Sequence, residues 1–281
     1  MKQRTLNCNG KLVVIDRPMT MGIVNVTPDS FYDGGAYRTE SGLIGRCEAI
    51  ISEGGDIIDI GACSTRPGAQ NTDAEEEMRR LDRALALVRK HFPAAIISVD
   101  TYRAANAKNA VENYGVDIIN DISAGTLDNA MFETVAALNV PYVLTHIRGT
   151  PSTMQENPVY GNLMEEVTGY FLESVHRLRN LGVKDIIIDP GFGFGKTIEH
   201  NYEMLYRLKD LEIFELPVLA GVSRKAMIYE LLETDARHAL NGTTAVNTLA
   251  LLGGADILRV HDVKEAVECV KIFNKWLSVN G

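Results

Sequence analysis

Eight short apolar runs recur along the chain, and each ends in a polar or glycine-rich cluster. Most runs are rich in valine and isoleucine. The clusters that follow them are residues 25–30, 61–68, 100, 120–121, 145–146, 189–191, 221–225 and 259–261. Continuous apolar runs of this length are typical of strands that are buried on both faces of a parallel sheet. Nearly all residues capable of chemistry therefore follow the carboxyl ends of predicted strands.

Eight segments with helical periodicity alternate with these runs. Their apolar residues recur at intervals of three and four over residues 41–52, 73–91, 104–114, 128–138, 162–181, 199–208, 237–252 and 263–277. Strict alternation of strand and helix predicts either a closed (βα)8 TIM barrel or a doubly wound open sheet. The α/β barrel is favoured, because all eight strand ends carry polar side chains and no G-x-G-x-x-G motif opens the first helix. In a barrel these ends form one rim, where the site is expected.

An alternating segment precedes the first barrel strand. Residues 5–15 alternate around Asn9-Gly10, a pair that is typical of a two-residue hairpin turn. We expect an N-terminal β-hairpin within residues 1–18, which closes the lower end of the barrel. The chain has 281 residues and shows no linker or longer internal repeat, so we expect a single domain over residues 1–281.

The composition argues against several partners and compartments. Lys and Arg number 28 against 37 Asp and Glu, a net charge of −9 without any basic block, so nucleic acid is not expected as a partner. The four cysteines show no C-x-x-C pair, which favours reduced thiols. No apolar stretch reaches the roughly 20 residues that cross a bilayer, and residues 1–16 lack the apolar core of a signal peptide. We therefore expect a cytoplasmic protein with no membrane partner.

The first two strand ends lead into loops that suit an anion or a cation. The amide oxygen of Asn25 suits a hard cation such as Mg²⁺, although residues 25–35 also fit an ordinary turn-rich connection. In the second loop Thr65 and Arg66 precede Pro67, and a guanidinium on a stiff turn suits a phosphate. An exposed surface turn is the alternative for this second loop.

Three of the other strand ends carry carboxylate or amide groups. Asp100, Asn120 and Asp189 each end a different strand. An amide both donates and accepts, whereas an ionised carboxylate only accepts, so this set suits a flat heterocycle with adjacent N–H donors and a carbonyl. A structural role as partners of Arg or Lys is the alternative.

The last strand ends combine glycine, aromatic and basic residues. Residues 189–196 alternate glycine with Phe192 and Phe194, which either cover an apolar ligand or pack in the core. Residues 223–225 open a helix, where backbone amides favour anions. Arg259 and His261 are two residues apart, so on a strand they face the same way and, with Arg66, suit a diphosphate.

Five motifs together resemble the bacterial dihydropteroate synthase family, whose members are the targets of sulfonamides. They are MGIVNVTPDSF at residues 21–31, STRPG at 64–68, DPGFGFGK at 189–196, SRK at 223–225 and RVH at 259–261. The resemblance runs from about residue 19 to the C-terminus. It implies a pterin-binding TIM barrel that condenses (7,8-dihydropterin-6-yl)methyl diphosphate with 4-aminobenzoate, giving 7,8-dihydropteroate and diphosphate. It also implies Mg²⁺, competition by sulfonamides and a homodimer.

The resemblance also implies roles for individual residues, with a catalytic set of Asp100, Asp189, Lys225, Arg259 and His261. For the pterin, the implied contacts are Asp100, Asn120, Asp189 and Lys225. For the diphosphate they are Thr65, Arg66, Arg259 and His261, with Val260 also in the substrate-binding set and Asn25 as the Mg²⁺ ligand. For 4-aminobenzoate they are Phe31, Thr65, Pro67, Phe194 and Lys225.

Four positions depart from the family pattern. Ala62 and Cys63 stand where glycine and an acidic or amide residue are common, and Thr145 stands where methionine is frequent. Ala226 replaces a serine that is common after the lysine of the SRK motif, so we expect weaker binding of the aminobenzoate carboxylate.

Three other functions fit parts of the same pattern. A corrinoid-linked methyltetrahydrofolate methyltransferase shares a pterin-binding barrel but has no need of a diphosphate site. A Schiff-base aldolase would use Lys225 as its nucleophile. A non-catalytic pterin-binding protein would bind the pterin diphosphate without releasing diphosphate.

Overall fold

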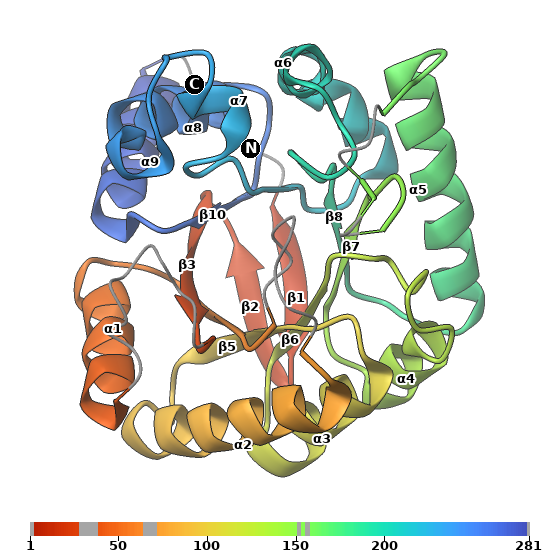
Figure 1. Ribbon diagram of the computed structural model, residues 1–281, viewed down its shortest axis with the longest axis vertical. Coiled ribbons are helices and arrows are strands. Elements are labelled where there is room, and N and C mark those ends of the chain that lie inside the picture. Colours follow the sequence, from red (N-terminus) through yellow and green to blue (C-terminus); the bar gives the residue numbers. More distant parts are fainter. Residues whose placement is uncertain (1–2, 28–38, 64–71, 151–152, 155–157, 280–281) are drawn as a thin grey trace.

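Eight parallel strands form a closed ring in the computed structural model, which describes residues 3–27, 39–63, 72–150, 153–154 and 158–279 (Figure 1). The strands are β3 (Met19–Asn25), β4 (Ile57–Gly61), β5 (Ile96–Asp100), β6 (Ile118–Asp121), β7 (Tyr142–Thr145), β8 (Ile186–Asp189), β9 (Leu219–Ala220) and β10 (Ile257–Val260). Their order is β8-β7-β6-β5-β4-β3-β10-β9, and a parallel bridge between Ile188 and Val218 closes the ring. The predicted TIM barrel is confirmed, and the open sheet is excluded.

Helices surround this ring on its outer side (Figure 1). They are α1 (Glu40–Ser52), α2 (Ala74–His91), α3 (Ala104–Tyr114), α4 (Met131–Leu138), α5 (Leu163–Asn180), α6 (Ile198–Tyr206), α7 (Ala226–Tyr229), α8 (Leu240–Leu252) and α9 (Val263–Ser278), with 3-10 turns η2 (Leu208–Phe214) and η3 (Ala236–His238). All eight predicted helices are confirmed with small shifts at their ends. The short helix α7 begins directly after residues 223–225, which were expected to open a helix, but its four residues are too few to show a helical period.

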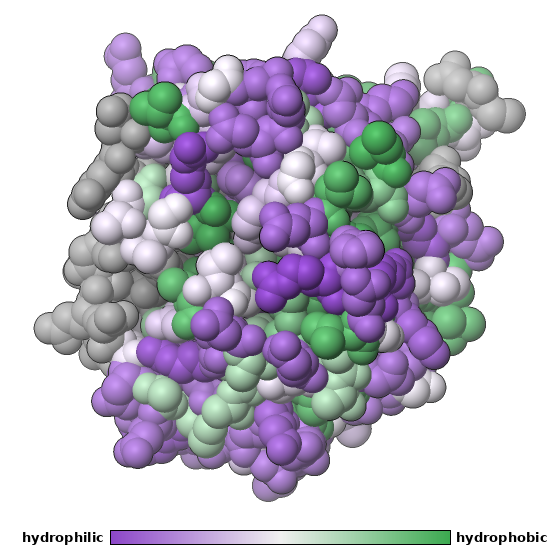
Figure 2. Space-filling model, turned by 90° about the vertical axis from the view of Figure 1, so that its right-hand side faces the viewer, coloured by the Kyte–Doolittle hydropathy of each residue, from purple (hydrophilic) through white to green (hydrophobic). Residues whose placement is uncertain are grey.

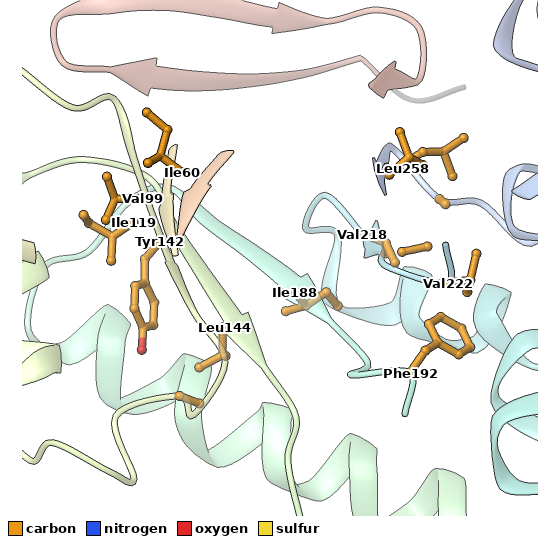
Figure 3. Packing of buried hydrophobic residues seen from close by; sticks show 14 of the residues in the cluster. Ile60, Val99, Ile119, Tyr142, Leu144, Ile188, Phe192, Val218, Val222 and Leu258 are labelled. Carbon is orange, nitrogen blue, oxygen red and sulfur yellow. The ribbon is translucent and has the colours of Figure 1, made fainter. Parts of the chain in front are cut away.

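The main hydrophobic core lies between the ring and the helices. Alternate residues of each strand point outward, as Ile60, Val99 and Ile188 do, and they are fully buried in this core (Figure 3). The residues between them point into the barrel. Side chains near the carboxyl ends of the strands that face inward therefore meet inside the ring, and this placement builds the site.

A β-hairpin covers the opposite end of the barrel and lies behind the ring in Figure 1. Strands β1 (Arg4–Cys8) and β2 (Lys11–Ile15) are joined by Asn9 and Gly10, which both have positive φ angles, 49° and 85°. Such angles fit the predicted two-residue turn. Buried hairpin residues, among them Leu6, pack on residues near the amino ends of the strands such as Ile257. The hairpin prediction is confirmed.

The outer face over the helices is mainly hydrophilic, as the side shown in Figure 2 illustrates. Among the described residues, no helix combines the length and apolar character that crossing a bilayer requires.

Candidate active site

Inward-facing polar side chains from several neighbouring strands form a cluster at the carboxyl ends of the barrel strands. Arg259 of β10 lies at its centre: its Nε donates to Asp59 Oδ2 at 2.7 Å, and its Nη2 donates to Asp100 Oδ2 at 2.6 Å. Asn120 of β6 contacts the same carboxylate, with its Nδ2 atom 3.3 Å from Asp59 Oδ2. One guanidinium therefore connects side chains that are up to 200 residues apart in the sequence.

The charges of this cluster depend on one another. Burial disfavours the charge of Arg259, but Asp59 and Asp100 outweigh burial and hold the pKa of Arg259 above its usual range. Burial also raises the pKa of Asp100 to about 7, although Arg259 opposes this shift. Both shifts follow from the same geometry, because a single guanidinium faces two carboxylates and cannot fully neutralise both.

Asp59 was missed among the predicted site residues. It lies inside the apolar run of β4 rather than at its end, and it is completely buried. A carboxylate at an inward position of a buried strand was the available signal, since buried carboxylates are almost always paired. The structure supplies its partner, Arg259.

A second group lies at the ends of β8 and β9. Asp189 is buried, its Oδ1 accepts the Gly191 amide at 2.7 Å, and burial raises its pKa above the usual range. Lys225 Nζ donates to the Phe192 carbonyl oxygen and lies 4.5 Å from the centroid of the Phe194 ring. Burial lowers the pKa of Lys225 to about 8, while Asp189 opposes this shift. The sequence left open whether Phe192 and Phe194 cover a ligand or pack in the core. Phe192 packs in the core, whereas Phe194 is half-buried beside Lys225.

His261 stands at the end of β10 on the same side as Arg259. Its Nδ1 atom lies 3.0 Å from Ser223 Oγ, and its backbone amide donates to the same hydroxyl oxygen at 3.2 Å. Val260 points the other way into the helix–strand core and is fully buried, so its side chain lies outside the cluster. Its place in the substrate-binding set stays a prediction, for which the side chain is turned away because neighbouring strand residues face opposite sides.

The turn before α7 is fastened within the protein. Arg224 forms an ion pair with Asp262 through Nε and Nη2, both at 2.6 Å, so its charge is held beside Asp262, just after the carboxyl end of β10. The Arg224 amide donates to Thr243 Oγ1 at 3.0 Å. The expected anion site at this helix start is therefore weakened, because α7 has only four residues and at least this amide is engaged.

Asn25 ends β3 directly beside the charged cluster. Gly61 pairs with Asn25 in the sheet, and a Cβ atom on Gly61 would lie 3.5 Å from Asn25 Oδ1 and 3.7 Å from Asp100 Oδ2. The absence of a side chain at Gly61 thus leaves space between an amide oxygen and a carboxylate. No group of three or more His, Cys, Asp or Glu side chains suited to a metal ion occurs within the described ranges.

The remaining predicted positions differ in how far the structure describes them. Phe31, Thr65, Arg66 and Pro67 lie outside the described residues. Of the departures from the family pattern, Ala62 is buried, Cys63 is partly exposed, and Ala226 begins α7. Thr145 faces into the barrel beside Asp189, and its buried hydroxyl has no hydrogen-bond partner among the described residues.

Comparisons with known proteins agree with this geometry. The family model described as "Pterin binding enzyme" matches residues 21–261. Dihydropteroate synthase of Escherichia coli K12 is 40% identical over 275 residues, covering 97% of this chain and 96% of the relative. That of Haemophilus influenzae is 38% identical over 270 residues, covering 95% and 97%.

Solved structures give the same result. The Yersinia pestis dihydropteroate synthase, in complex with a sulfonamide drug, superimposes with a TM-score of 0.93 at 37% identity, covering 98% of this chain and 100% of the other. The Xanthomonas albilineans enzyme with 4-aminobenzoic acid gives a TM-score of 0.87 at 36% identity, covering 100% and 99%. The family inferred from five short motifs is thereby confirmed, and the chain belongs to the dihydropteroate synthase family of pterin-binding enzymes.

Proposed function

We propose that this chain joins the methylene carbon of (7,8-dihydropterin-6-yl)methyl diphosphate to the amine of 4-aminobenzoate and releases diphosphate. The observation that carries the proposal is the Arg259 guanidinium, which faces the barrel interior between Asp59 and Asp100. It places a cation that never loses its charge beside carboxylates suited to a heterocycle. Relatives of known structure bind 4-aminobenzoate and sulfonamides, which supports the same substrate class here.

We assign the pterin ring to the deepest part of the cluster. Asp100, Asn120 and Asp189 line it from three strands, and Lys225 faces Asp189 from the next turn. Ionised carboxylates accept N–H groups of the heterocycle, and the lysine ammonium donates to an acceptor on its edge. Carboxylates also stabilise the positive charge that develops on the pterin when the diphosphate leaves.

We assign the diphosphate to the rim, where Arg259 and His261 lie, and we add Arg66 and Thr65 to this set because the family resemblance implies them. A charged hydrogen bond contributes about 1.5 to 3 kcal/mol, so several of them offset the charge that grows on the leaving group. Asn25 fits a hard cation through its amide oxygen, which points into the space beside Gly61. Asn25 would hold Mg²⁺ there, and the bound ion would supply positive charge toward the diphosphate.

We assign the 4-aminobenzoate to a pocket that includes Phe194 and Lys225, together with Phe31, Thr65 and Pro67, which the family resemblance implies. An arylamine is nucleophilic when neutral, so no strong general base is required, and departure of the diphosphate precedes attack. Sulfonamides are proposed to compete for this pocket. The half-buried Phe194 ring beside Lys225 is the described part of its wall.

We also propose a single domain, a homodimer and a cytoplasmic location. Helices α8 and α9 pack side by side and expose Leu249, Leu252, Ile272 and Trp276, an apolar face suited to a second copy. Light scattering should give twice the chain mass, and Trp276→Glu should yield monomers. None of the four cysteines forms a disulfide among the described residues, which agrees with a reducing compartment.

The decisive experiment measures diphosphate release from the pterin diphosphate, with and without 4-aminobenzoate and Mg²⁺. Steady turnover should depend on all three components and should yield 7,8-dihydropteroate for each diphosphate released. Pterin binding without diphosphate release would indicate a binding protein instead. Trapping of Lys225 by borohydride with a carbonyl substrate would indicate an aldolase.

A further inference from the structure

Lys196 is a buried lysine to which the proposed reaction gives no role. Only 3% of its surface is exposed, and within the described part of the chain its ammonium forms no ion pair with a carboxylate. It has instead three neutral acceptors: His146 Nδ1 at 2.9 Å, Gly191 O at 3.0 Å and Phe194 O at 3.3 Å. An ammonium group has three N–H donors, so these contacts match its full donor capacity.

His146 is fixed as an acceptor in this arrangement. The residue is only 4% exposed and its ring packs against Tyr170 and Phe171. Burial, together with Lys196 and Arg148, lowers the pKa of His146 to about 2. The imidazole is therefore neutral, with Nδ1 free of a proton. Its backbone amide donates to Asp189 O at 2.9 Å, so the end of β7 is joined to the end of β8.

The three contacts of Lys196 fasten the segment that carries part of the candidate active site. Within this segment the Gly191 amide binds Asp189, the Phe192 carbonyl binds Lys225, and the Phe194 ring lies under the Lys225 ammonium. Lys196 holds the two carbonyl groups on either side, those of Gly191 and Phe194. A shift of either carbonyl would move Lys225 or the Phe194 ring.

The segment also packs tightly on the chain beside His146. Gly191 has a φ angle of 69°, and a Cβ atom there would lie 1.9 Å from the His146 carbonyl oxygen. At the other end, a Cβ on Gly195 would lie 2.5 Å from the Arg148 carbonyl oxygen. Two backbone segments in such close contact define one position for the turn, with the Lys196 ammonium between them.

We propose that Lys196 is a positioning residue for substrate binding, which acts by holding residues 191–194 so that Phe194 and Lys225 face the substrates. The inference rests on the proposed assignment of Asp189, Lys225 and Phe194 to the substrates. A lysine whose three hydrogen-bond acceptors are all neutral is costly to bury, and burial lowers the pKa of Lys196 to about 7 although the nearby Asp189 opposes this shift. For folding alone, an apolar side chain of similar length would serve as well as lysine. A positioning role therefore predicts that such a substitution weakens substrate binding, whereas a purely structural role does not.

The test compares Lys196→Met with Lys90→Met, a control on the exposed surface of α2. Lys196→Met should raise the dissociation constant of the pterin substrate and the aminobenzoate KM at least about 10-fold, without a lower thermal midpoint. Lys90→Met should change neither constant. A further variant, His146→Gln, supplies a carbonyl oxygen as acceptor and should retain most of the affinity, whereas His146→Leu should share the defect of Lys196→Met.

The double variant Lys196→Met/His146→Leu covers the case in which the single variant folds poorly. Replacing both side chains by apolar groups removes the unpaired His146 Nδ1, and Gly191 O still accepts the Phe194 amide at 3.0 Å, so of the three acceptors only the Phe194 carbonyl loses its donor within the described residues. This protein should therefore fold better than the single variant and should still show the higher constants. Wild-type constants in either folded variant would overturn the proposal, as would an activity loss that only follows the loss of folded protein.

Asp189→Asn, measured in the same assays, separates this inference from the proposed function. If Asp189→Asn weakens pterin binding while Lys196→Met leaves both constants unchanged, only the positioning role is wrong. If Asp189→Asn binds the pterin like the wild type, the assignment of the pterin to this cluster is wrong, and the proposed role of Lys196 is overturned with it.

Discussion

Arg259 and Asp100 are joined by a 2.6 Å hydrogen bond, although 159 residues separate them in the sequence. The bond is possible because β10 and β5 both turn these side chains into the barrel, and because the same guanidinium reaches Asp59 through its Nε atom. The planar fork of donors holds two carboxylates at fixed angles. Loss of that fork is therefore expected to disturb the whole cluster.

Arg259→Lys should lower kcat/KM about 10-fold to 100-fold. A lysine retains the charge but cannot reproduce the two directed N–H groups, and one charged hydrogen bond is worth about 1.5 to 3 kcal/mol. Steady-state kinetics check this, with Arg207→Lys as the control, since Arg207 forms an exposed ion pair with Asp210 at 2.9 Å. Equal kinetics for both variants would show that the guanidinium fork has no role in the reaction.

Pterin affinity should strengthen as the pH rises through the neutral range. Burial raises the pKa of Asp100 from 3.8 to about 7, so the folded protein keeps a proton that the unfolded chain has already lost. The stability that this proton contributes is greatest below the unfolded pKa and is lost as the pH rises to about 7. Over the same interval the carboxylate that accepts pterin N–H groups is formed.

Asp59→Asn should move that binding midpoint to lower pH. The substitution removes a negative charge that raises the pKa of Asp100, and it leaves Arg259 with a single carboxylate partner. Titration of pterin binding by fluorescence measures the midpoint. The same titration in an Asp189→Asn background removes the contribution of Asp189, a second buried carboxyl whose pKa is also raised. An unchanged midpoint would contradict the coupling between Asp59 and Asp100.

Asp189→Asn should reduce kcat/KM by clearly more than 10-fold. A neutral hydrogen bond contributes about 0.5 to 1.5 kcal/mol, and about 1.4 kcal/mol corresponds to a factor of ten. The carboxylate also faces Lys225 and the charge that develops on the pterin, so its loss should cost more free energy than the loss of one neutral hydrogen bond. Asp16→Asn, on the exposed hairpin side, serves as the control. Near-wild-type turnover would argue against electrostatic stabilisation by Asp189.

The sequence allowed prediction of the barrel and of where the described candidate site residues lie, because both depend on local periodicity. Strand ends meet at one rim whatever the details of packing, so Asp100, Asn120, Asp189 and Arg259 could be grouped before any coordinates. Pairwise contacts could not be predicted in the same way. The pairing of Asp59 with Arg259 depends on the register of β4 and β10, which join through β3.

The direction in which individual side chains point was also not predicted from the motifs. The RVH motif groups Val260 with its two basic neighbours, although a strand turns it toward the helices. Lys196 belongs by sequence to a glycine-rich motif, and its burial follows from the close packing of Gly191 and Gly195 on the segment after β7. Such contacts between different loops leave no periodic signal in the sequence.

Ala226→Ser should strengthen aminobenzoate binding and lower the aminobenzoate KM. Ala226 begins α7 directly after Lys225, so a hydroxyl at this position extends from the same turn that places the ammonium beside Phe194. The neighbouring Arg224 amide is engaged by Thr243, and the Arg224 side chain is engaged by Asp262, so neither readily replaces that hydroxyl. One added hydrogen bond of about 1 kcal/mol corresponds to a KM that is about five times lower.

Steady-state kinetics with varied aminobenzoate measure the effect, and the pterin constant should stay unchanged, since the pterin is assigned to deeper residues. An unchanged or higher aminobenzoate KM would show that the carboxylate of this substrate does not reach the start of α7.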